Sequence, residues 1–163
     1  MTSDTIEGDL TMRNGQTTMH NVEIINCSQA MTEKAALRFE GAAGGHSHVS
    51  NSSIHHGLSW GSSMIASANV LLQNNIIFRH TPFGIVVQRA KNITLQGNFV
   101  SHIGERDLGP TEKFTDRRAG ISICAHEFEK DKCPDMHLIG NIVAGASYAG
   151  FIVPGHECGK SAS

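Results

Sequence analysis

"NVLLQNNIIFRH", residues 69–80, places two asparagines between apolar residues that would otherwise form one continuous core strand. Asn74 and Asn75 separate Leu72 from Ile76. Related segments occur along the chain: "NVEIINC" from Asn21, "HVSNSSI" from His48, "NITLQGNFV" from Asn92 and "MHLIGNIV" from Met136. Because the pattern recurs, the asparagines belong to a repeating architecture.

The repeat has a nearly constant length. The aligned apolar residues are Ile24, Val49, Leu72, Leu95 and Leu138, with spacings of 25, 23, 23 and 43 residues. The last spacing equals one repeat plus an insertion of about 20 residues. A second strand family lies between these segments: "ALRF" from Ala36, "SMIA" from Ser63, "GIVV" from Gly84, "GISI" from Gly120 and "GFIV" from Gly150. Short strands at this period predict a β-solenoid.

An antiparallel sandwich would also show short strands separated by turns. It would not require asparagine at a fixed 23-residue interval. We therefore predict an all-β fold, a right-handed parallel β-helix of about five to six coils that forms a single domain over residues 1–163. Residues 104–118 are expected to be an inserted loop and residues 125–132 a short charged excursion.

The aligned polar residues predict a structural ladder at one corner of the helix. Side-chain amides stacked on successive coils can bond one another and the turn backbone, which satisfies polar groups that the corner would bury. The residues of this predicted ladder are Ser52, Asn75, Asn98 and Asn141.

Composition narrows the classes of partner. The 163 residues carry a net charge of −2 with no basic cluster, which argues against nucleic acid as a partner. No apolar run is long enough to span a bilayer, so direct membrane insertion is not expected. The first residues lack the apolar core of a signal peptide. The chain is accordingly either cytoplasmic or a fragment of a longer secreted chain.

Four cysteines allow three complete pairings. Cys124 and Cys133 flank "AHEFEKDK" and are candidates for a local disulfide, and the alternative is buried or free thiols. No CxxC pair occurs, so neither a metal site nor a cofactor is predicted.

Histidines provide one candidate binding site. His56, Arg79 and His102 follow aligned apolar residues by two positions and should stack at one corner, with His80 beside them. Such a strip could bind ligands or respond to pH. The alternative is that these are turn residues chosen by local hydrogen bonding.

Acidic residues provide candidates for catalysis. Glu105, Asp107 and Asp116 cluster in the predicted loop, where they alternate with basic residues. A loop of mixed charge is typical of a solvated excursion, although loops on rigid scaffolds also carry binding sites. Asn92 begins an Asn-Ile-Thr sequon and is the glycosylation candidate, because it should point outward.

Residues 117–159, "RRAGISICAHEFEKDKCPDMHLIGNIVAGASYAGFIVPGHECG", resemble the fibrocystin and fibrocystin-like family (polycystic kidney and hepatic disease proteins). The upstream repeats resemble the parallel β-helix (PbH1) repeats of the same family, and similar repeats occur in the related cell-surface hyaluronidases. The resemblance implies a piece of a large, mostly extracellular, membrane-anchored or secreted glycoprotein at the cell surface, associated with cilia or stereocilia.

The resulting hypothesis is a non-catalytic extracellular β-helix module that acts as a rigid spacer and as a protein or glycan interaction surface. Unpaired strand edges at the open ends of the helix predict contacts with other domains of the same or a neighbouring chain. One rival is a carbohydrate-active enzyme, either a hyaluronidase-like hydrolase or a pectate-type lyase. Another is a carbohydrate-binding module without turnover.

Overall fold

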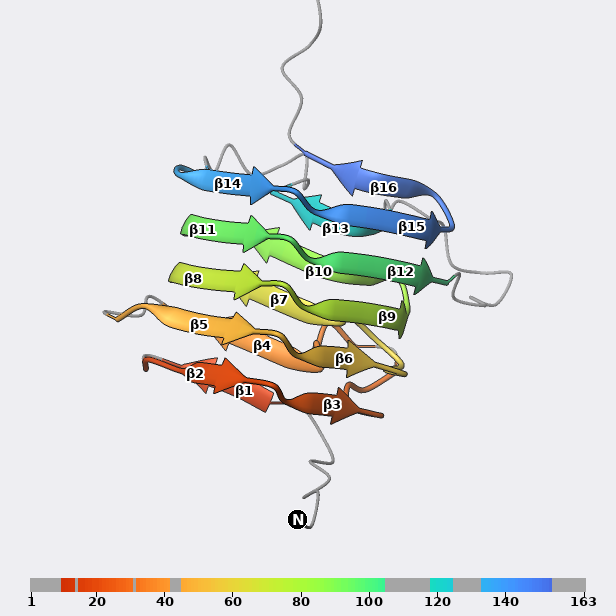
Figure 1. Cartoon of the computed structure of the whole chain (residues 1–163), viewed down its shortest axis with the longest axis horizontal. Helices are drawn as coiled ribbons and strands as arrows, with labels where there is room; N and C mark the ends of the chain where they lie inside the picture. The colour runs from red at the N-terminus through yellow and green to blue at the C-terminus, as the bar shows by residue number, and fades with distance from the viewer. Residues whose placement is uncertain are drawn as a thin grey trace, which may run out of the picture.

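The computed structural model describes residues 10–13, 15–30, 32–41, 45–104, 118–124 and 133–153. Within these residues the chain forms sixteen β-strands and no helix. The strands make three sheets that are stacked coil on coil along one axis, from β1 at one end to β16 at the other (Figure 1).

Each sheet takes every third strand of the chain. The first sheet contains β1 (Leu10–Arg13), β4 (Leu37–Glu40), β7 (Ser62–Ile65), β10 (Phe83–Gln88), β13 (Ala119–Ile123) and β16 (Ala149–Ile152). The second contains β2 (Thr18–His20), β5 (Ser47–Ser50), β8 (Ala68–Gln73), β11 (Lys91–Gln96) and β14 (Met136–Ile139). The third contains β3 (Glu23–Ile25), β6 (Ser53–His55), β9 (Ile76–His80), β12 (Phe99–Ile103) and β15 (Ile142–Ala146).

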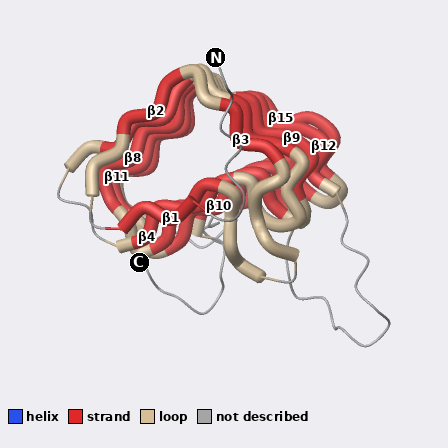
Figure 2. Tube along the Cα trace, turned by 90° about the horizontal axis from the view of Figure 1, so that it is seen from below, coloured by secondary structure: helices blue, strands red, loops and turns tan. Residues whose placement is uncertain are grey.

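All neighbouring strands within the three sheets pair in parallel. The chain therefore winds around a common axis, and Figure 2 shows the three sheets as the three sides of the coil. Five complete coils are followed by β16, which begins a sixth. The predicted parallel β-helix is confirmed.

The core consists of aliphatic columns that run along the axis. Leu95 pairs with Leu72 on one side and with Leu138 on the other, and Leu72 pairs with Val49. Val49, Leu72 and Leu95 are buried. In the third sheet a parallel column buries Ile54, Ile77 and Val100. Alternation along each strand sends one set of side chains into this core and the other outward.

The predicted register was wrong in the first coil. Ile24 pairs with Ile54 in the third sheet, and Met19 is the residue opposite Val49. The first repeat is 30 residues long rather than 25, because the connections from β3 to β4 and from β4 to β5 are both longer than those of the next coil. Asn21–Asn26 resembles the later Asn-ended strands closely enough to hide this extension.

The register of β7 also differs from the prediction by two residues. The sequence alignment placed Ser63 opposite Gly84. In the structure Ser63 pairs with Val86 and Ser62 pairs with Ile85, so Gly61 lies opposite Gly84. The apolar pair Met64–Ile65 gave no indication of this shift.

Glycines form a column in the first sheet where the third sheet packs against it. A Cβ on Gly84 would lie 2.6 Å from the carbonyl oxygen of Gly120 and would also overlap the Val100 side chain. Gly120 has the same relation to Val143 one coil later. Only glycine allows the aliphatic column of the third sheet to approach this closely, which explains the repeated "GI" start of these strands.

The predicted excursions at 104–118 and 125–132 lie, apart from Gly104 and Arg118, outside the described residues. In the part of the chain that the structure describes, no helix has the length and apolar character of a membrane span.

Candidate functional site

The corner between the second and third sheets carries a hydrogen-bonded carboxamide ladder, formed by Ser52, Asn75, Asn98 and Asn141. Asn75 Nδ2 donates to Asn98 Oδ1 and to the carbonyl of Val49, both at 3.0 Å. The backbone N–H of Asn75 donates to the same Asn98 oxygen at 3.0 Å. Asn98 repeats these bonds one coil further, to Asn141 Oδ1 and to the carbonyl of Leu72.

The residue before each ladder position has a left-handed backbone and an outward side chain. Asn21, Asn51 and Asn74 have φ values of 55°, 50° and 54°. Asparagine and glycine are the residues that adopt this conformation most readily, and Gly97 and Gly140 hold the equivalent positions on later coils. The paired asparagines at 74 and 75 thus have separate tasks: the first makes the bend and the second bonds the coils together.

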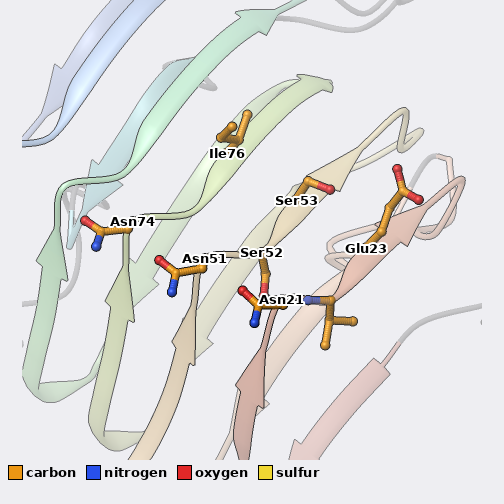
Figure 3. A pocket seen from close by; sticks show the side chains of 8 residues that line it. Asn21, Glu23, Asn51, Ser52, Ser53, Asn74 and Ile76 are labelled. Atoms are coloured by element: carbon orange, nitrogen blue, oxygen red, sulfur yellow. Dashed lines mark hydrogen bonds between the residues drawn. The ribbon is translucent and has the colours of Figure 1, made fainter.

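The three exposed asparagines form an amide row beside a groove. The groove has a volume of about 430 Å³ and is lined by the row together with Val22, Glu23, Ser52, Ser53 and Ile76. Figure 3 shows the side chains of Asn21, Asn51 and Asn74 side by side on neighbouring coils. Their backbone N–H groups bond the next coil, whereas their side-chain amides have no hydrogen-bond partner among the described residues.

A second polar feature, the histidine strip, lies at the far edge of the third sheet. His56, Arg79 and His102 occupy equivalent positions on three successive coils and share left-handed φ values of 58°, 55° and 51°. Arg79 Nη1 donates to His56 Nε2 at 2.7 Å. His102 is exposed and its Nδ1 lies 3.1 Å from Ser101 Oγ.

The strip continues into a relay that crosses three coils. His56 Nδ1 lies 2.6 Å from His55 Nδ1, and His55 Nε2 lies 2.9 Å from Glu23 Oε1. Arginine can only donate and a carboxylate can only accept. The proton positions are therefore fixed: Arg79 donates to His56, His56 Nδ1–H donates to His55, and His55 Nε2–H donates to Glu23. Both imidazoles are neutral in this arrangement.

The surroundings of His56 favour its neutral form. Partial burial, the neighbouring His55 ring and the Arg79 guanidinium lower the pKa of His56 below its usual value of 6.5. The His55 ring also stacks on Phe78, with 4.6 Å between ring centroids. The relay leaves Arg79 at one end and the exposed Glu23 carboxylate at the other, so it presents both signs of charge to solvent.

His80 does not join the strip. Its side chain is 1% exposed, and its Nδ1 and Nε2 each lie 3.1 Å from a carbonyl oxygen, of Ser59 and Ile54 respectively. Burial lowers the pKa of His80, although the two carbonyls oppose this effect. The left-handed backbone at Arg79 interrupts the alternation along β9 and turns His80 inward, where its ring lies beside the segment that follows β6.

The outer face of the third sheet is polar on the first two coils, where Glu23 and Ser53 point outward, and apolar on the third to fifth coils. Ile76 and Phe99 are paired on neighbouring coils and are 48% and 39% exposed. The amide row borders this face on one side and the histidine strip on the other. Such a face can offer hydrogen bonds, an apolar contact and charge to one ligand.

The remaining predicted residues lie elsewhere. Glu105, Asp107 and Asp116 are outside the described residues, so their mutual geometry is not shown. Cys124 and Cys133 are joined by a disulfide that closes the segment 125–132. Across the described ranges, no group of three or more His, Cys, Asp or Glu side chains is placed to hold a metal ion.

Asn92, the predicted glycosylation position, is the second residue of β11 and has a left-handed backbone with a φ of 51°. It is half-buried, and its Nδ2 donates to Asn69 Oδ1 at 2.8 Å. A glycosylated amide keeps one N–H, so this bond and a glycan are compatible.

Sequence reasoning missed Glu23 and the amide row. Glu23 belongs to the misaligned first coil, so its contact with His55 was hidden by the register error. The amide row had a detectable signal, an Asn or Gly directly before every ladder position. No separate role was assigned to these preceding residues from the sequence.

Comparisons with known proteins agree with this architecture. The family described as "Right handed beta helix region" matches residues 8–158. Two curated relatives are fibrocystin of Canis lupus familiaris, 28% identical over 86% of this chain, and fibrocystin of Mus musculus, 30% identical over 85% of this chain. The chain spans about 3% of the length of either relative. No solved structure matches the chain at a significant level.

The resemblance to fibrocystin β-helix repeats noted in the sequence is confirmed by these relatives. The family match also fixes the hand of the solenoid as right-handed, as the sequence predicted. With matched residues covering nearly the whole coil stack, the chain belongs to the right-handed β-helix family and contains a fibrocystin-like β-helix region.

Proposed function

We propose that this chain is a non-catalytic extracellular module of a fibrocystin-like cell-surface protein, which serves as a rigid spacer and as an interaction surface for a protein or glycan. The observation that carries the proposal is the ladder, which ties successive coils through buried hydrogen bonds. Fully satisfied buried networks of this kind make a structure rigid. The similarity to fibrocystin over most of the chain supports the placement in a longer surface protein.

The interaction surface in this proposal is the outer face of the third sheet. Exposed amides can bond sugar hydroxyls, and Ile76 and Phe99 can pack against the apolar side of a pyranose ring. Arg79 and His102 could bind a carboxylate at the other edge. Neighbouring coils repeat at about 4.8 Å, close to the length of one sugar unit in an extended chain. A glycan that carries carboxylates therefore matches the chemistry of this face.

A glycan array with acidic and neutral polysaccharides tests the binding role. We expect retention of acidic glycans, weakened several-fold in Arg79→Asn and in the double variant Asn51→Gly/Asn74→Gly. Both substitutions suit a left-handed backbone. Asn69→Gly, at a different corner, is the matched control and should bind like the natural chain. Binding that is absent, or equal in all variants, would remove this face from the proposal.

The enzyme alternative requires its own assay. A glycosidase needs two carboxyl groups on either side of the bond it cleaves, and the described acids, Glu23, Glu33, Glu40 and Asp135, include no pair in register on neighbouring coils. We expect no shortening of hyaluronan or polygalacturonate by size-exclusion chromatography, with or without calcium. Shortening that is lost on mutating Glu105, Asp107 or Asp116 would instead establish a polysaccharide-degrading enzyme.

A further inference from the structure

The helix is open at its last coil. β14, β15 and β16 are the terminal strands of the three sheets, so each leaves one edge unpaired among the described residues (Figure 1). Leu138 continues a column in which Leu72 and Leu95 are 1% exposed, yet Leu138 itself is 38% exposed. The core of the solenoid therefore reaches solvent at this end.

The backbone N–H groups at the ladder corner point toward this open end. At each earlier corner, two consecutive backbone N–H groups donate toward the following coil. The first bonds a strand carbonyl: Asn51 N to Gln73 O, Asn74 N to Gln96 O, Gly97 N to Ile139 O. The second bonds a carboxamide oxygen: Ser52 N to Asn75 Oδ1, Asn75 N to Asn98 Oδ1, Asn98 N to Asn141 Oδ1. The second, third and fourth coils are thus each completed by the asparagine of the coil after them, whereas Ser52 completes the first coil.

The last corner has the same geometry without these partners. Gly140 has a φ of 61°, like the left-handed residues below it, and its N–H and that of Asn141 have no acceptor in the described structure. The carbonyl of Leu138 is the next in the series Val49, Leu72 and Leu95, whose carbonyls accept Nδ2–H from the following coil. Two donors and one acceptor are therefore presented together beside an exposed apolar column.

We propose that the open end of the last coil is a docking surface for a further β-helix coil that carries asparagine at this corner. A carboxamide can accept from Asn141 N–H and donate to the Leu138 carbonyl at once, as Asn141 does for Asn98 and Leu95. A serine cannot do both, because Ser52 Oγ accepts from Val22 N–H but donates within its own coil, to Ser50 O. An aliphatic residue would leave the Asn141 N–H and the Leu138 carbonyl unpaired, because only the Gly140 N–H is expected to bond a strand carbonyl of the added coil.

A second copy of this chain does not fit the same surface. In a head-to-tail contact its first coil would be placed on the last coil, and the residue at its ladder position is Val22. Valine supplies neither acceptor nor donor, so two polar groups would be buried without partners. The occupant is a coil of a different sequence from the first coil of this chain, with Asn at the corner and apolar residues that cover Leu138 and Val143.

The experiment adds such a coil from the chain's own repeat. Val153 follows β16 at the position that Val87 holds in β10, so a copy of residues 88–103 fused after Val153, in place of residues 154–163, continues the register. This copy brings a duplicate of Asn98 over Asn141. The matched control has leucine in place of the duplicated asparagine, with similar volume and no carboxamide. A chain that ends at Val153 is the reference.

Amide hydrogen exchange at Asn141 is the readout. We expect slower exchange in the asparagine extension than in the leucine extension by about tenfold, the effect of one to two net hydrogen bonds. In a second measurement, a free peptide of the same sequence is added to the natural chain and followed by NMR shifts at Gly140 and Asn141. The asparagine peptide should bind about tenfold more tightly than its leucine counterpart.

Equal protection by the two extensions, or no protection and no peptide binding, would overturn the proposal. Concentration-dependent head-to-tail oligomers of the natural chain in sedimentation velocity would overturn the choice of occupant. The proposed coil partner rests on the module role given above. A chain that binds no glycan would still show this protection, so the two proposals fail separately.

Discussion

Adjacent asparagines 74 and 75 should differ sharply in their contribution to stability. Asn75 is 1% exposed, whereas Asn74 is exposed. Replacing Asn75 by leucine keeps a similar volume but removes the acceptor of Ser52 N–H. The carbonyl of Val49 and the Oδ1 of Asn98 each lose a donor in the same substitution.

The expected decrease in the free energy of unfolding follows from these lost hydrogen bonds. A buried N–H without an acceptor costs about 1–3 kcal/mol, and each lost hydrogen bond about 0.5–1.5 kcal/mol. Because the Asn98 oxygen keeps the backbone N–H of residue 75 as its donor, we expect Asn75→Leu to lower the free energy of unfolding by about 2–4 kcal/mol. That is a large part of the 5–15 kcal/mol typical of a domain. Asn74→Gly should change it by no more than about 0.5 kcal/mol, since glycine suits the left-handed backbone.

Urea unfolding followed by circular dichroism measures both variants, with linear extrapolation to water. The slope with denaturant should be unchanged, because both variants expose the same surface on unfolding. If Asn75→Leu unfolds at the same urea concentration as the natural chain, the ladder role of Asn75 is refuted. If Asn74→Gly lowers the free energy of unfolding as much as Asn75→Leu does, the assignment of the bend to Asn74 and of the ladder to Asn75 is refuted.

Three further outcomes follow from the packing, the buried histidine and the disulfide. Gly84→Ala should lower the melting temperature and cost about 1–3 kcal/mol through overpacking, whereas Gly150→Ala in the same column, whose Cβ would meet nothing nearer than 3.7 Å, should not; similar melts for both would contradict the close approach. Because the pKa of His80 is lowered from 6.5, the unfolded chain binds more protons as pH falls below 6.5, so stability present above that pH should be lost below it. Urea melts from pH 8 to pH 5 should show a shallower loss in His80→Gln, and identical slopes would refute this assignment. Non-reducing peptide mapping of secreted material should recover the Cys124–Cys133 pair, and recovery of both as thiols would exclude the disulfide.

The sequence predicted the fold because one physical constraint repeats at a fixed interval. Each coil must satisfy a buried corner, and asparagine is the residue that accepts and donates there at once. The constant spacing between Asn75 and Asn98 therefore revealed the coil length directly. A ladder of this kind is visible in sequence because its members share one residue type.

The first coil could not be placed in the same way. Its ladder position is occupied by Val22, so the periodic signal is missing where the connection to β4 is longest. As a result Ile24 was assigned to the wrong sheet and Glu23 was not recognised as the partner of His55. The inward turn of His80 was missed because alternation had to be counted across the left-handed residue at Arg79.

The most direct test of the account is a set of long-range NMR contacts between aligned residues of successive coils. The parallel β-helix predicts nuclear Overhauser effects between the side chains of Leu72 and Leu95 and between those of Leu95 and Leu138, together with Asn75 Nδ2 protons protected from exchange. Strong Hα–Hα contacts between neighbouring strands are expected only of antiparallel pairing. Observing those contacts instead, or an unprotected Asn75 amide, would contradict the stacked coils on which the proposed spacer and docking roles depend.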